Sequence, residues 1–358
     1  MTDFTAKITE KVSIWEKLRQ TAKPILLYGM GDGAEKIIHC LSLYGKKPTG
    51  VFASDDFVRG QEFLDYKVKK YTDFAEEYED FIVLIAFGTQ IPEVIANILR
   101  IAAERETYAP NVPLFGEGLF DCDFVKKHEA EFAAVYEKLA DAKSQEVFLN
   151  LCNYGISGKI EYLMDSVSEK AEANRILGLG KNEVYLDLGA YNGDTVLEFA
   201  ETIGGEYRQI LAVEPDGKNF KKFLKNTDFL PNVTGINYGI WQEKADLFFS
   251  SKAGRNSALS TQDSRSVQCL AVDDIAAQYA EAPISYIKMD VEGVEKQALL
   301  GAEKTLKTAK PKMLVSAYHR NEDLFALPLL IWRYNPDYKI YLRRHLYIPG
   351  WENNYYCI

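Results

Sequence analysis

The stretch Val184-Tyr185-Leu186-Asp187-Leu188-Gly189-Ala190-Tyr191-Asn192-Gly193-Asp194-Thr195 decides the fold of this chain. It is an apolar run with an acidic residue near its end, then two glycines, and residues 196–200 continue it as an amphipathic segment. This order predicts a strand, a tight turn and a helix. Glycine is favoured at such a turn because the backbone has to bend sharply and admit a ligand where a Cβ would intrude. The stretch therefore predicts a loop that binds a nucleotide cofactor.

The charges of this loop indicate which cofactor it binds. A dinucleotide loop places pyrophosphate at a helix N-terminus, but here Asp187 and Asp194 would repel a phosphate. Two carboxylates suit a ligand with an ammonium and a sulfonium, which describes S-adenosylmethionine. A second apolar run, 210–213, is followed by Glu214. This residue comes about 20 positions beyond Gly193, where an acidic side chain accepts hydrogen bonds from both ribose hydroxyls.

Three motifs together carry a family resemblance. They are residues 187–195 of the glycine loop, Val213-Glu214-Pro215, and Ile287-Lys288-Met289-Asp290-Val291-Glu292-Gly293-Val294-Glu295. They resemble the FkbM family of S-adenosylmethionine-dependent methyltransferases, of which the last motif is the hallmark. The resemblance runs from about residue 183 to the C-terminus, is weaker back to about 139, and does not cover the first hundred or so residues.

The resemblance implies a fold, an activity and a set of site residues. The fold is an α/β class I methyltransferase domain, Rossmann-like, with a seven-stranded sheet that ends in an antiparallel hairpin. The activity is methylation of a hydroxyl on a saccharide or secondary metabolite. The residues expected to bind the donor are Asp187, Gly189, Ala190, Asn192, Gly193, Asp194, Thr195, Glu214, Pro215, Tyr238, Gly239, Asp290 and Glu292.

Ionisable residues at the ends of two predicted strands are the candidates for catalysis. Lys288 and Asp290 lie two positions apart in strand 284–290 and so share one face of it. His319 follows strand 312–317, and strand ends of this kind line the ligand crevice of an open sheet. Asp290 and His319 are alternative general bases, and Lys288 either pairs with a carboxylate or lies beside the transferred methyl group. We could assemble no set of metal ligands, so the sequence predicts no metal.

The first hundred residues predict a second, smaller sheet. Strands at 24–28, 50–53 and 81–88 alternate with helices, of which one covers about 92–103. Alternating strands and helices are typical of a parallel Rossmann-like sheet. The pattern resembles the small nucleotide-sugar-binding domains found beside sugar-modifying enzymes. An amphipathic helix is expected before it, over about 5–20.

The glycine loop of this first sheet leaves two alternatives open. Gly29, Gly31 and Ala34 match the dinucleotide fingerprint, but Asp32 and Glu35 place negative charge where pyrophosphate would lie. The domain is then either purely structural or a nucleotide site that the stretch 88–90, at a strand end, helps to form.

The remaining segments complete the predicted organisation. Residues 1–116 form the first Rossmann-like domain, 117–178 a helical connector and 179–358 the methyltransferase domain. In the connector, the segment 160–168 either lies near the mouth of the donor site, as the resemblance implies, or is only a linker. Strands at 247–249 and 267–272 are expected to pair across the polar loop 254–257, and 338–358 to form the terminal hairpin.

Composition excludes several classes of partner. The chain has 358 residues, 52 of them acidic and 42 basic, with a net charge of -10, so nucleic acid and anionic membranes are not expected partners. The five cysteines show no CxxC spacing, which argues against a disulfide framework and a zinc site. No run is long enough to span a bilayer, and the expected location is cytoplasmic. Homo-oligomer formation, an NAD-dependent oxidoreductase and an inactive scaffold remain open alternatives.

Overall fold

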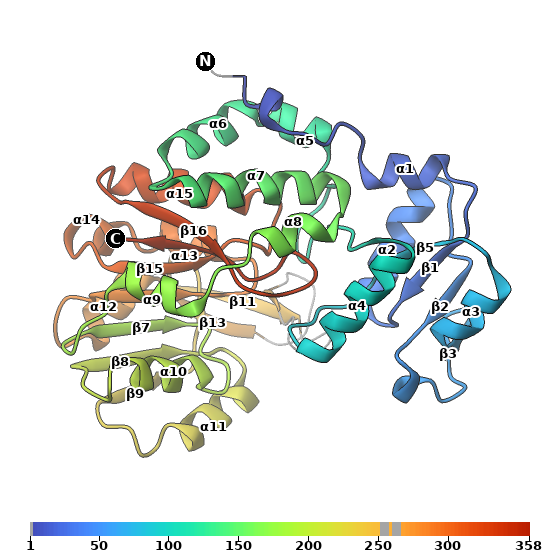
Figure 1. Cartoon of the computed structure of the whole chain (residues 1–358). Helices are drawn as coiled ribbons and strands as arrows, with labels where there is room; N and C mark the ends of the chain where they lie inside the picture. Colours follow the sequence, from blue (N-terminus) through green and yellow to red (C-terminus); the bar gives the residue numbers. More distant parts are fainter. Residues whose placement is uncertain (1–2, 251–257, 260–265) are drawn as a thin grey trace.

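Two large sheets, connected by a group of helices, organise the molecule (Figure 1). The computed structural model describes residues 3–250, 258–259 and 266–358, and of residues 248–250 and 258–259 only the backbone. In the described part of the chain, no helix combines the length and the apolar character needed to cross a membrane.

The N-terminal sheet has six strands in the order β3-β4-β2-β1-β5-β6. Every neighbouring pair is parallel except β3 with β4. Helices α1 and α2 cover one face of this sheet, and α3 and α4 cover the other. Alternate strand residues point to opposite faces, and accordingly they pack in two different core clusters, one with each pair of helices. The bounds are β1 Ile25–Tyr28, β2 Gly50–Phe52, β3 Glu62–Phe63, β4 Tyr66–Lys69, β5 Ile82–Ile85, β6 Glu106–Tyr108, α1 Ile14–Gln20, α2 Asp32–Leu43, α3 Tyr71–Glu77 and α4 Pro92–Glu104, with 3-10 turns η1 Thr5–Lys7 and η2 Asp55–Phe57.

The C-terminal sheet has seven strands in the order β16-β17-β15-β14-β7-β8-β9. Only β17 runs antiparallel to its neighbours β15 and β16. The expected seven-stranded sheet with an antiparallel terminal hairpin is thus confirmed. The bounds are β7 Val184–Leu188, β8 Gln209–Val213, β9 Val233–Ile236, β14 Tyr286–Met289, β15 Lys312–Ser316, β16 Ile340–Arg344 and β17 Asn353–Cys357.

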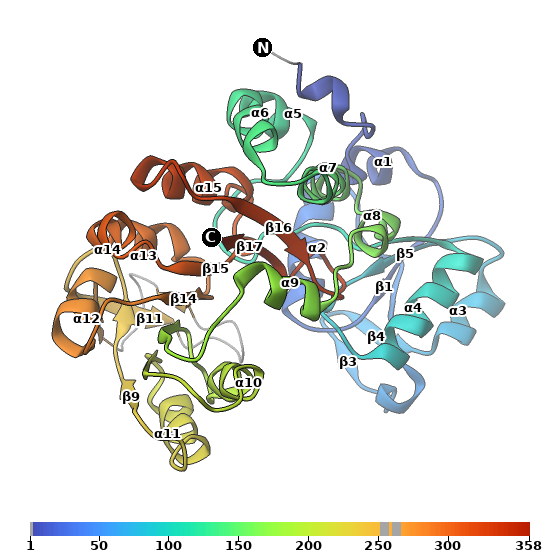
Figure 2. The same ribbon diagram turned by 60° about the vertical axis from the view of Figure 1, so that its left-hand side comes forward.

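Helices cover both faces of this second sheet (Figure 2). Tyr185 packs with α9, α10 and α11, whereas Leu186 and Leu188 pack with the helices of the opposite face. This alternation follows from the two-residue period of a strand. The helices of the first face are α9 Lys170–Leu177, α10 Asp194–Thr202 and α11 Gly217–Asn226, and those of the second are α12 Val272–Tyr279, α13 Glu295–Leu300, α14 Glu303–Thr308 and α15 Asp323–Tyr334.

The connecting helices pack onto the second sheet instead of spanning a gap between the sheets. They are α5 Cys122–Lys127, α6 Glu129–Lys138, α7 Ala142–Ser157 and α8 Ile160–Asp165, and α6 contacts α15 while α7 contacts β16. Asp141 caps α7 by accepting from the backbone of Ser144 at 2.8 Å. The same carboxylate accepts from Nη2 of the buried Arg343 at 2.6 Å, so the start of α7 is tied to β16.

A small third sheet follows β9. It has the order β10-β13-β11-β12, with β10 Gly239–Ile240, β11 Ala245–Ser250, β12 Ala258–Leu259 and β13 Ser266–Leu270. The expected pairing of the segments around 247–249 and 267–272 is confirmed by the antiparallel β11 and β13. The predicted polar loop 254–257 lies outside the described residues.

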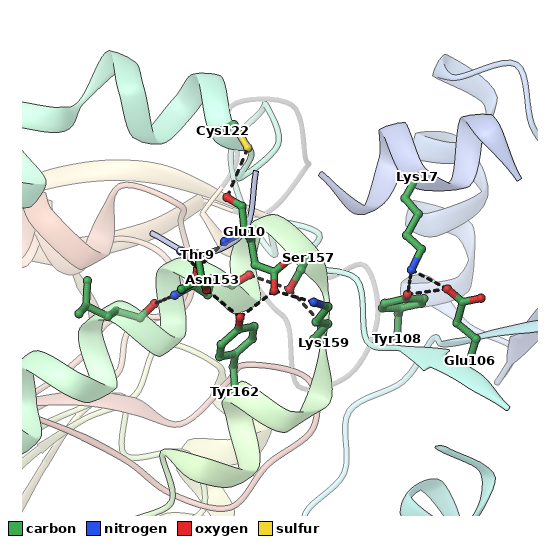
Figure 3. A network of polar contacts seen from close by, with 11 residues as sticks. Thr9, Glu10, Lys17, Glu106, Tyr108, Cys122, Asn153, Ser157, Lys159 and Tyr162 are labelled. Atoms are coloured by element: carbon green, nitrogen blue, oxygen red, sulfur yellow. Dashed lines mark hydrogen bonds and ion pairs between the residues drawn. The ribbon is translucent and has the colours of Figure 1, made fainter. Parts of the chain in front are cut away.

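The single opening helix expected over 5–20 is wrong. A 3-10 turn covers Thr5–Lys7, and α1 begins only at Ile14, after Ser13, whose side chain caps it. Between them, the backbone N–H groups of Thr9 and Glu10 donate to Oδ1 of Asn153 in α7, at 2.9 and 3.0 Å (Figure 3). Because these donors are committed to a connector helix, they cannot continue a local helix.

The carboxyl end of the N-terminal sheet touches the hairpin of the C-terminal sheet. The backbone of Thr89, shortly after β5, exchanges two hydrogen bonds with that of Ile348, at 2.8 and 3.0 Å. Ile348 lies between β16 and β17, so the hairpin loop is held by both sheets. The ends of strands from both sheets therefore meet at one place.

Candidate active site

A cavity of about 520 Å³ lies where the two sheets meet. Gly189, Glu214, Asp290 and Tyr318, which follow β7, β8, β14 and β15, line it from the C-terminal sheet. Gln90, beyond the end of β5, lines it from the N-terminal sheet. The cavity thus occupies the crevice outside the carboxyl ends of parallel strands, where ligands bind in sheets of this kind.

The turn after β7 requires glycine for a reason that differs from the expectation. Gly189 has a φ of +86°, which side chains rarely adopt. A Cβ at this position would lie 2.0 Å from the carbonyl oxygen of Asp290. The glycine therefore allows close packing of the turn against the end of β14, and the neighbouring backbone, not a ligand, would meet the added Cβ.

Asp187 and Lys288 form a buried pair beneath the cavity. Nζ of Lys288 lies 3.4 Å from Oδ1 of Asp187 and donates to the carbonyl of Gly189 at 3.1 Å. Oδ2 of Asp187 accepts from the hydroxyl of Thr195 at the start of α10. Burial alone would lower the pKa of Lys288, but Asp187 and neighbouring carboxylates raise it. Lys288 is therefore a charged group that braces the turn.

Glu214 is held in a fixed orientation at the cavity wall. Its Oε2 accepts from the backbone N–H of Tyr191 and its Oε1 from that of Asp216, both at 2.9 Å. Burial raises the pKa of this carboxyl to about 7. Each oxygen retains acceptor capacity for a ligand, since a carboxylate oxygen can accept more than one hydrogen bond.

His319 lies among three carboxylates. Its Nδ1 is 2.9 Å from Oε1 of Glu295, and its Nε2 is 3.5 Å from Oδ1 of Asp290 and from Oε2 of Glu292. Burial alone would lower the pKa of His319, but these carboxylates raise it well above its ordinary value. An imidazole that holds its proton so firmly is a poor general base. This environment favours Asp290 over His319 among the two alternative general bases.

The loop of the hallmark motif is held by its own last residue. Oε1 of Glu295 accepts from the backbone N–H groups of Val291 and Gly293, at 3.0 and 3.4 Å. Glu292 has a φ of +54°, an uncommon conformation for a residue with a side chain. Burial raises the pKa of Glu292, and His319 lowers it in part. Strained backbone of this kind is concentrated at ligand sites.

The structure brings most of the expected site residues to the cavity and leaves some aside. Those that line it are Gly189, Asp194, Thr195, Glu214, Pro215, Gly239, Lys288, Asp290, Glu292 and His319. Asp187, Ala190, Asn192, Gly193 and Tyr238 are not among the lining residues. Ala190 packs in the core cluster under α10, and Asp187 acts through Lys288 and Thr195. From the connector, α9 contributes lining residues, whereas the expected segment 160–168 contributes none.

One wall of the cavity was missed by sequence reasoning. It is built by the hairpin residues Tyr347, Trp351, Glu352 and Asn354, and it lies beside Gln90, which belongs to the stretch 88–90 that the sequence analysis singled out. The rings of Tyr347 and Trp351 lie 5.3 Å apart. The aromatic residues flanking the turn at Pro349 and Gly350 were the signal that could have identified this wall, but a turn between strands is also rich in aromatics for packing reasons.

The N-terminal glycine loop does not contribute to the cavity. Residues 29–35 are absent from its lining. A Cβ on Gly33 would lie 2.5 Å from the carbonyl oxygen of Ala86, so this glycine allows α2 to approach β5 closely. Asp32 forms an ion pair with Lys36 at 3.2 Å. The loop has a clear packing role.

Comparison with known proteins finds a similar fold and one matching domain. No curated protein matches the chain. A methyltransferase FkbM from Methylobacillus flagellatus KT has the same fold, with a TM-score of 0.69, 20% identity, and coverage of 96% of this chain and 92% of that one. An Aeropyrum pernix fibrillarin with bound S-adenosyl-L-methionine (TM-score 0.33, 14% identity) covers 53% of this chain and 74% of its own. A Geobacter metallireducens precorrin methyltransferase (TM-score 0.34, 12% identity) covers 52% and 85%. Residues 187–348 match the Methyltransferase FkbM domain.

Proposed function

We propose that the protein transfers a methyl group from S-adenosylmethionine to a hydroxyl oxygen of a saccharide or secondary metabolite. The observation that carries the proposal is the Glu214 carboxylate. It is fixed by two backbone N–H groups at the end of β8, beside the glycine turn of an FkbM methyltransferase domain. A carboxylate at the end of this strand is placed to accept hydrogen bonds from both hydroxyls of a ribose.

The charge of the cavity supports a cationic donor. Asp194, Asp290, Glu292 and Glu352 all line it, against Lys288 and Lys170 as the lining lysines of the described residues. Lys288 is already paired with Asp187, and Lys170 with Glu198. The surplus of carboxylates favours a ligand with an ammonium and a sulfonium, and it disfavours the pyrophosphate of NAD.

The aromatic wall supports a polar acceptor with apolar faces. Tyr347 and Trp351 present neighbouring rings, and Gln90, Glu352 and Asn354 surround them with amide and carboxylate groups. Sugar rings offer C–H faces that pack on aromatic rings and hydroxyls that bond to polar side chains around them. This combination is the reason for placing a saccharide first among the acceptors.

The reaction requires alignment and removal of one proton. The acceptor oxygen attacks the methyl carbon of the sulfonium in line with the breaking carbon–sulfur bond, and the hydroxyl proton leaves as the carbon–oxygen bond forms. We assign the uptake of this proton to the cavity-lining carboxylates Asp290 and Glu292. His319, a buried cation between them, holds both in place.

The test compares two cofactors on the full-length protein. Isothermal titration calorimetry should show binding of S-adenosylmethionine and S-adenosylhomocysteine and none of NAD. Labelled S-adenosylmethionine should then transfer its methyl group to a member of a saccharide and polyketide panel. Binding of NAD in place of the methyl donor would support an oxidoreductase and refute the proposal. Donor binding without turnover on any hydroxyl acceptor would leave the inactive scaffold.

A further inference from the structure

A cluster of metal-ligating side chains lies at the cavity wall, beside the expected donor site. One carboxylate oxygen each of Asp290 and Glu295 and one imidazole nitrogen of His319 lie within 4.8 Å of one another. Asp290 and His319 line the cavity, so one side of the cluster is open to a ligand. The backbone places the cluster where β14 and β15 end, and α13 supplies Glu295.

One buried carboxylate oxygen of this cluster lacks a hydrogen-bond partner. Glu295 and His319 are each 1% exposed. Oε2 of Glu295 has no hydrogen-bond partner among the described residues, whereas Nδ1 of His319 lies 2.9 Å from Oε1 of the same carboxylate. Leaving a buried polar atom unsatisfied costs about 1 to 3 kcal/mol, and more for a charged group. A buried carboxylate with a free oxygen thus indicates a missing partner.

The charges indicate that this partner is a cation. Asp290, Glu292 and Glu295 surround His319, which forms an ion pair with each of them when protonated. In the described ranges, no lysine or arginine forms an ion pair with any of the three carboxylates. Even a protonated imidazole therefore leaves an excess of negative charge around the buried Glu295, where uncompensated charge is costly.

We propose that Asp290, Glu295 and His319 bind a divalent cation at the inner wall of the cavity. Two carboxylate oxygens and one neutral imidazole nitrogen suit first-row ions such as Mn²⁺, so the ion takes the place of the proton that His319 otherwise holds. Metal–ligand distances of about 2.1 Å require the three groups to move slightly toward one another. The positions on the cavity side of the ion remain open to an oxygen of the bound acceptor.

This site deepens the proposed function, on which its catalytic meaning rests. A cation that binds the acceptor hydroxyl through an open position orients it and favours its deprotonation. With Asp290 bound to the ion, Glu292 is the member of the carboxylate pair that stays free to take up the proton. The ion-binding site itself is a property of the chain that can be tested without any acceptor.

The experiment measures Mn²⁺ binding to the full-length, EDTA-treated protein by electron paramagnetic resonance of the free ion. One Mn²⁺ per chain should bind in the micromolar range. Asp290→Asn and His319→Gln should each raise the Kd by at least about tenfold. Thermal unfolding checks that each variant is folded. If His319→Gln does not fold, Asp290→Asn still tests the site, because the side chain of Asp290 is partly exposed. The exposed Asp228 provides the control Asp228→Asn, which should bind as the parent does.

A matched neighbour separates ligation from general attraction. Glu292→Gln removes the same charge as Asp290→Asn from the same wall without removing a proposed ligand, so it should weaken Mn²⁺ binding clearly less. Equal weakening by the two variants, or no bound Mn²⁺, would overturn the cation site. Calorimetry with S-adenosylmethionine on the same samples distinguishes failure of the cation site from failure of the methyl-transfer proposal. Donor binding without Mn²⁺ binding removes only the cation site, and Mn²⁺ binding without donor binding removes only the methyl-transfer proposal.

Discussion

Glu214 is the residue on which donor binding depends most directly. Its two oxygens are oriented by the N–H groups of Tyr191 and Asp216, so little orientation has to be gained when a ligand binds. Hydrogen bonds to a charged group are worth about 1.5 to 3 kcal/mol, and Glu214→Ala should weaken S-adenosylmethionine binding by that amount in calorimetry. The exposed Glu201 supplies the control Glu201→Gln, which should leave the affinity unchanged. An unaltered affinity in Glu214→Ala would remove the assignment.

The same residue makes donor binding and stability respond to pH in opposite directions. Burial raises the pKa of Glu214 from 4.5 to about 7 in the free protein. Because the ionised carboxylate accepts the ribose hydroxyls, donor affinity should fall as the pH drops below about 7. The pKa of Glu214 is higher in the folded protein than in the unfolded chain, so the folded state binds this proton more tightly. The resulting contribution of Glu214 to stability is fully present below pH 4.5 and is lost as the pH rises through about 7. In Glu214→Gln, both the donor affinity and the unfolding temperature should depend less on pH than in the parent protein.

Gly189 shows how one residue fixes the geometry of the turn. In Gly189→Ala the new Cβ would press on the Asp290 carbonyl at 2.0 Å, and a φ of +86° would be strained as well. We expect a loss of about 3 kcal/mol or more in the free energy of unfolding. Gly204 also has a positive φ, +71°, but nothing lies within 4 Å of its added Cβ. Gly204→Ala should therefore cost only the strain, about 1 to 2 kcal/mol, and equal losses in denaturant titrations would contradict the clash.

At the scale of elements, the strands of the site could be predicted and the wall facing them could not. Local patterns determine β7, β8, β14 and β15, because apolar runs, glycine turns and strand-end charges occur within a few residues. The prediction of one opening helix was wrong because the backbone N–H groups of residues 9 and 10 donate to Asn153, more than a hundred residues away in sequence. The contact of Thr89 with Ile348 is equally remote in sequence. Contacts of this kind depend on how whole elements pack, and the local periodicity of apolar residues does not predict them.

The end of β5 and the hairpin loop together form one wall of the cavity, and a substitution at Gly88 tests the role of this wall. A Cβ on Gly88 would lie 2.3 Å from the Trp351 ring and 2.9 Å from that of Tyr347. Gly88→Ala should displace these rings, lowering turnover with the acceptor while the donor affinity in calorimetry stays the same. Gly31→Ala is the matched control, since its Cβ meets nothing within 4 Å and should leave turnover unchanged. A loss of donor affinity in Gly88→Ala would show that this wall serves the donor.

At the scale of the whole molecule, one hydrophobic core extends across the two sheets and the connector. One continuous cluster of buried residues includes Tyr28 of the first sheet, Phe148 of the connector and Leu186 of the second sheet. Near the N-terminus, Phe4 stacks on Phe132 at a ring separation of 5.7 Å, so Phe4 packs on the connector. The division at 1–116, 117–178 and 179–358 is therefore a proposal about topology, and the packing joins the three segments energetically.

A continuous core predicts cooperative unfolding of the entire chain. Differential scanning calorimetry should show one transition, because exposing either sheet would uncover apolar surface that the other parts bury. S-adenosylmethionine, which binds only the native state, should shift that single transition to higher temperature. Asn153→Ala is expected to lower its midpoint, since two backbone donors of residues 9 and 10 would lose hydrogen bonds worth about 0.5 to 1.5 kcal/mol each. If the trace instead showed two transitions, with the donor shifting only one, the N-terminal sheet would be an independent unit attached to the methyltransferase domain.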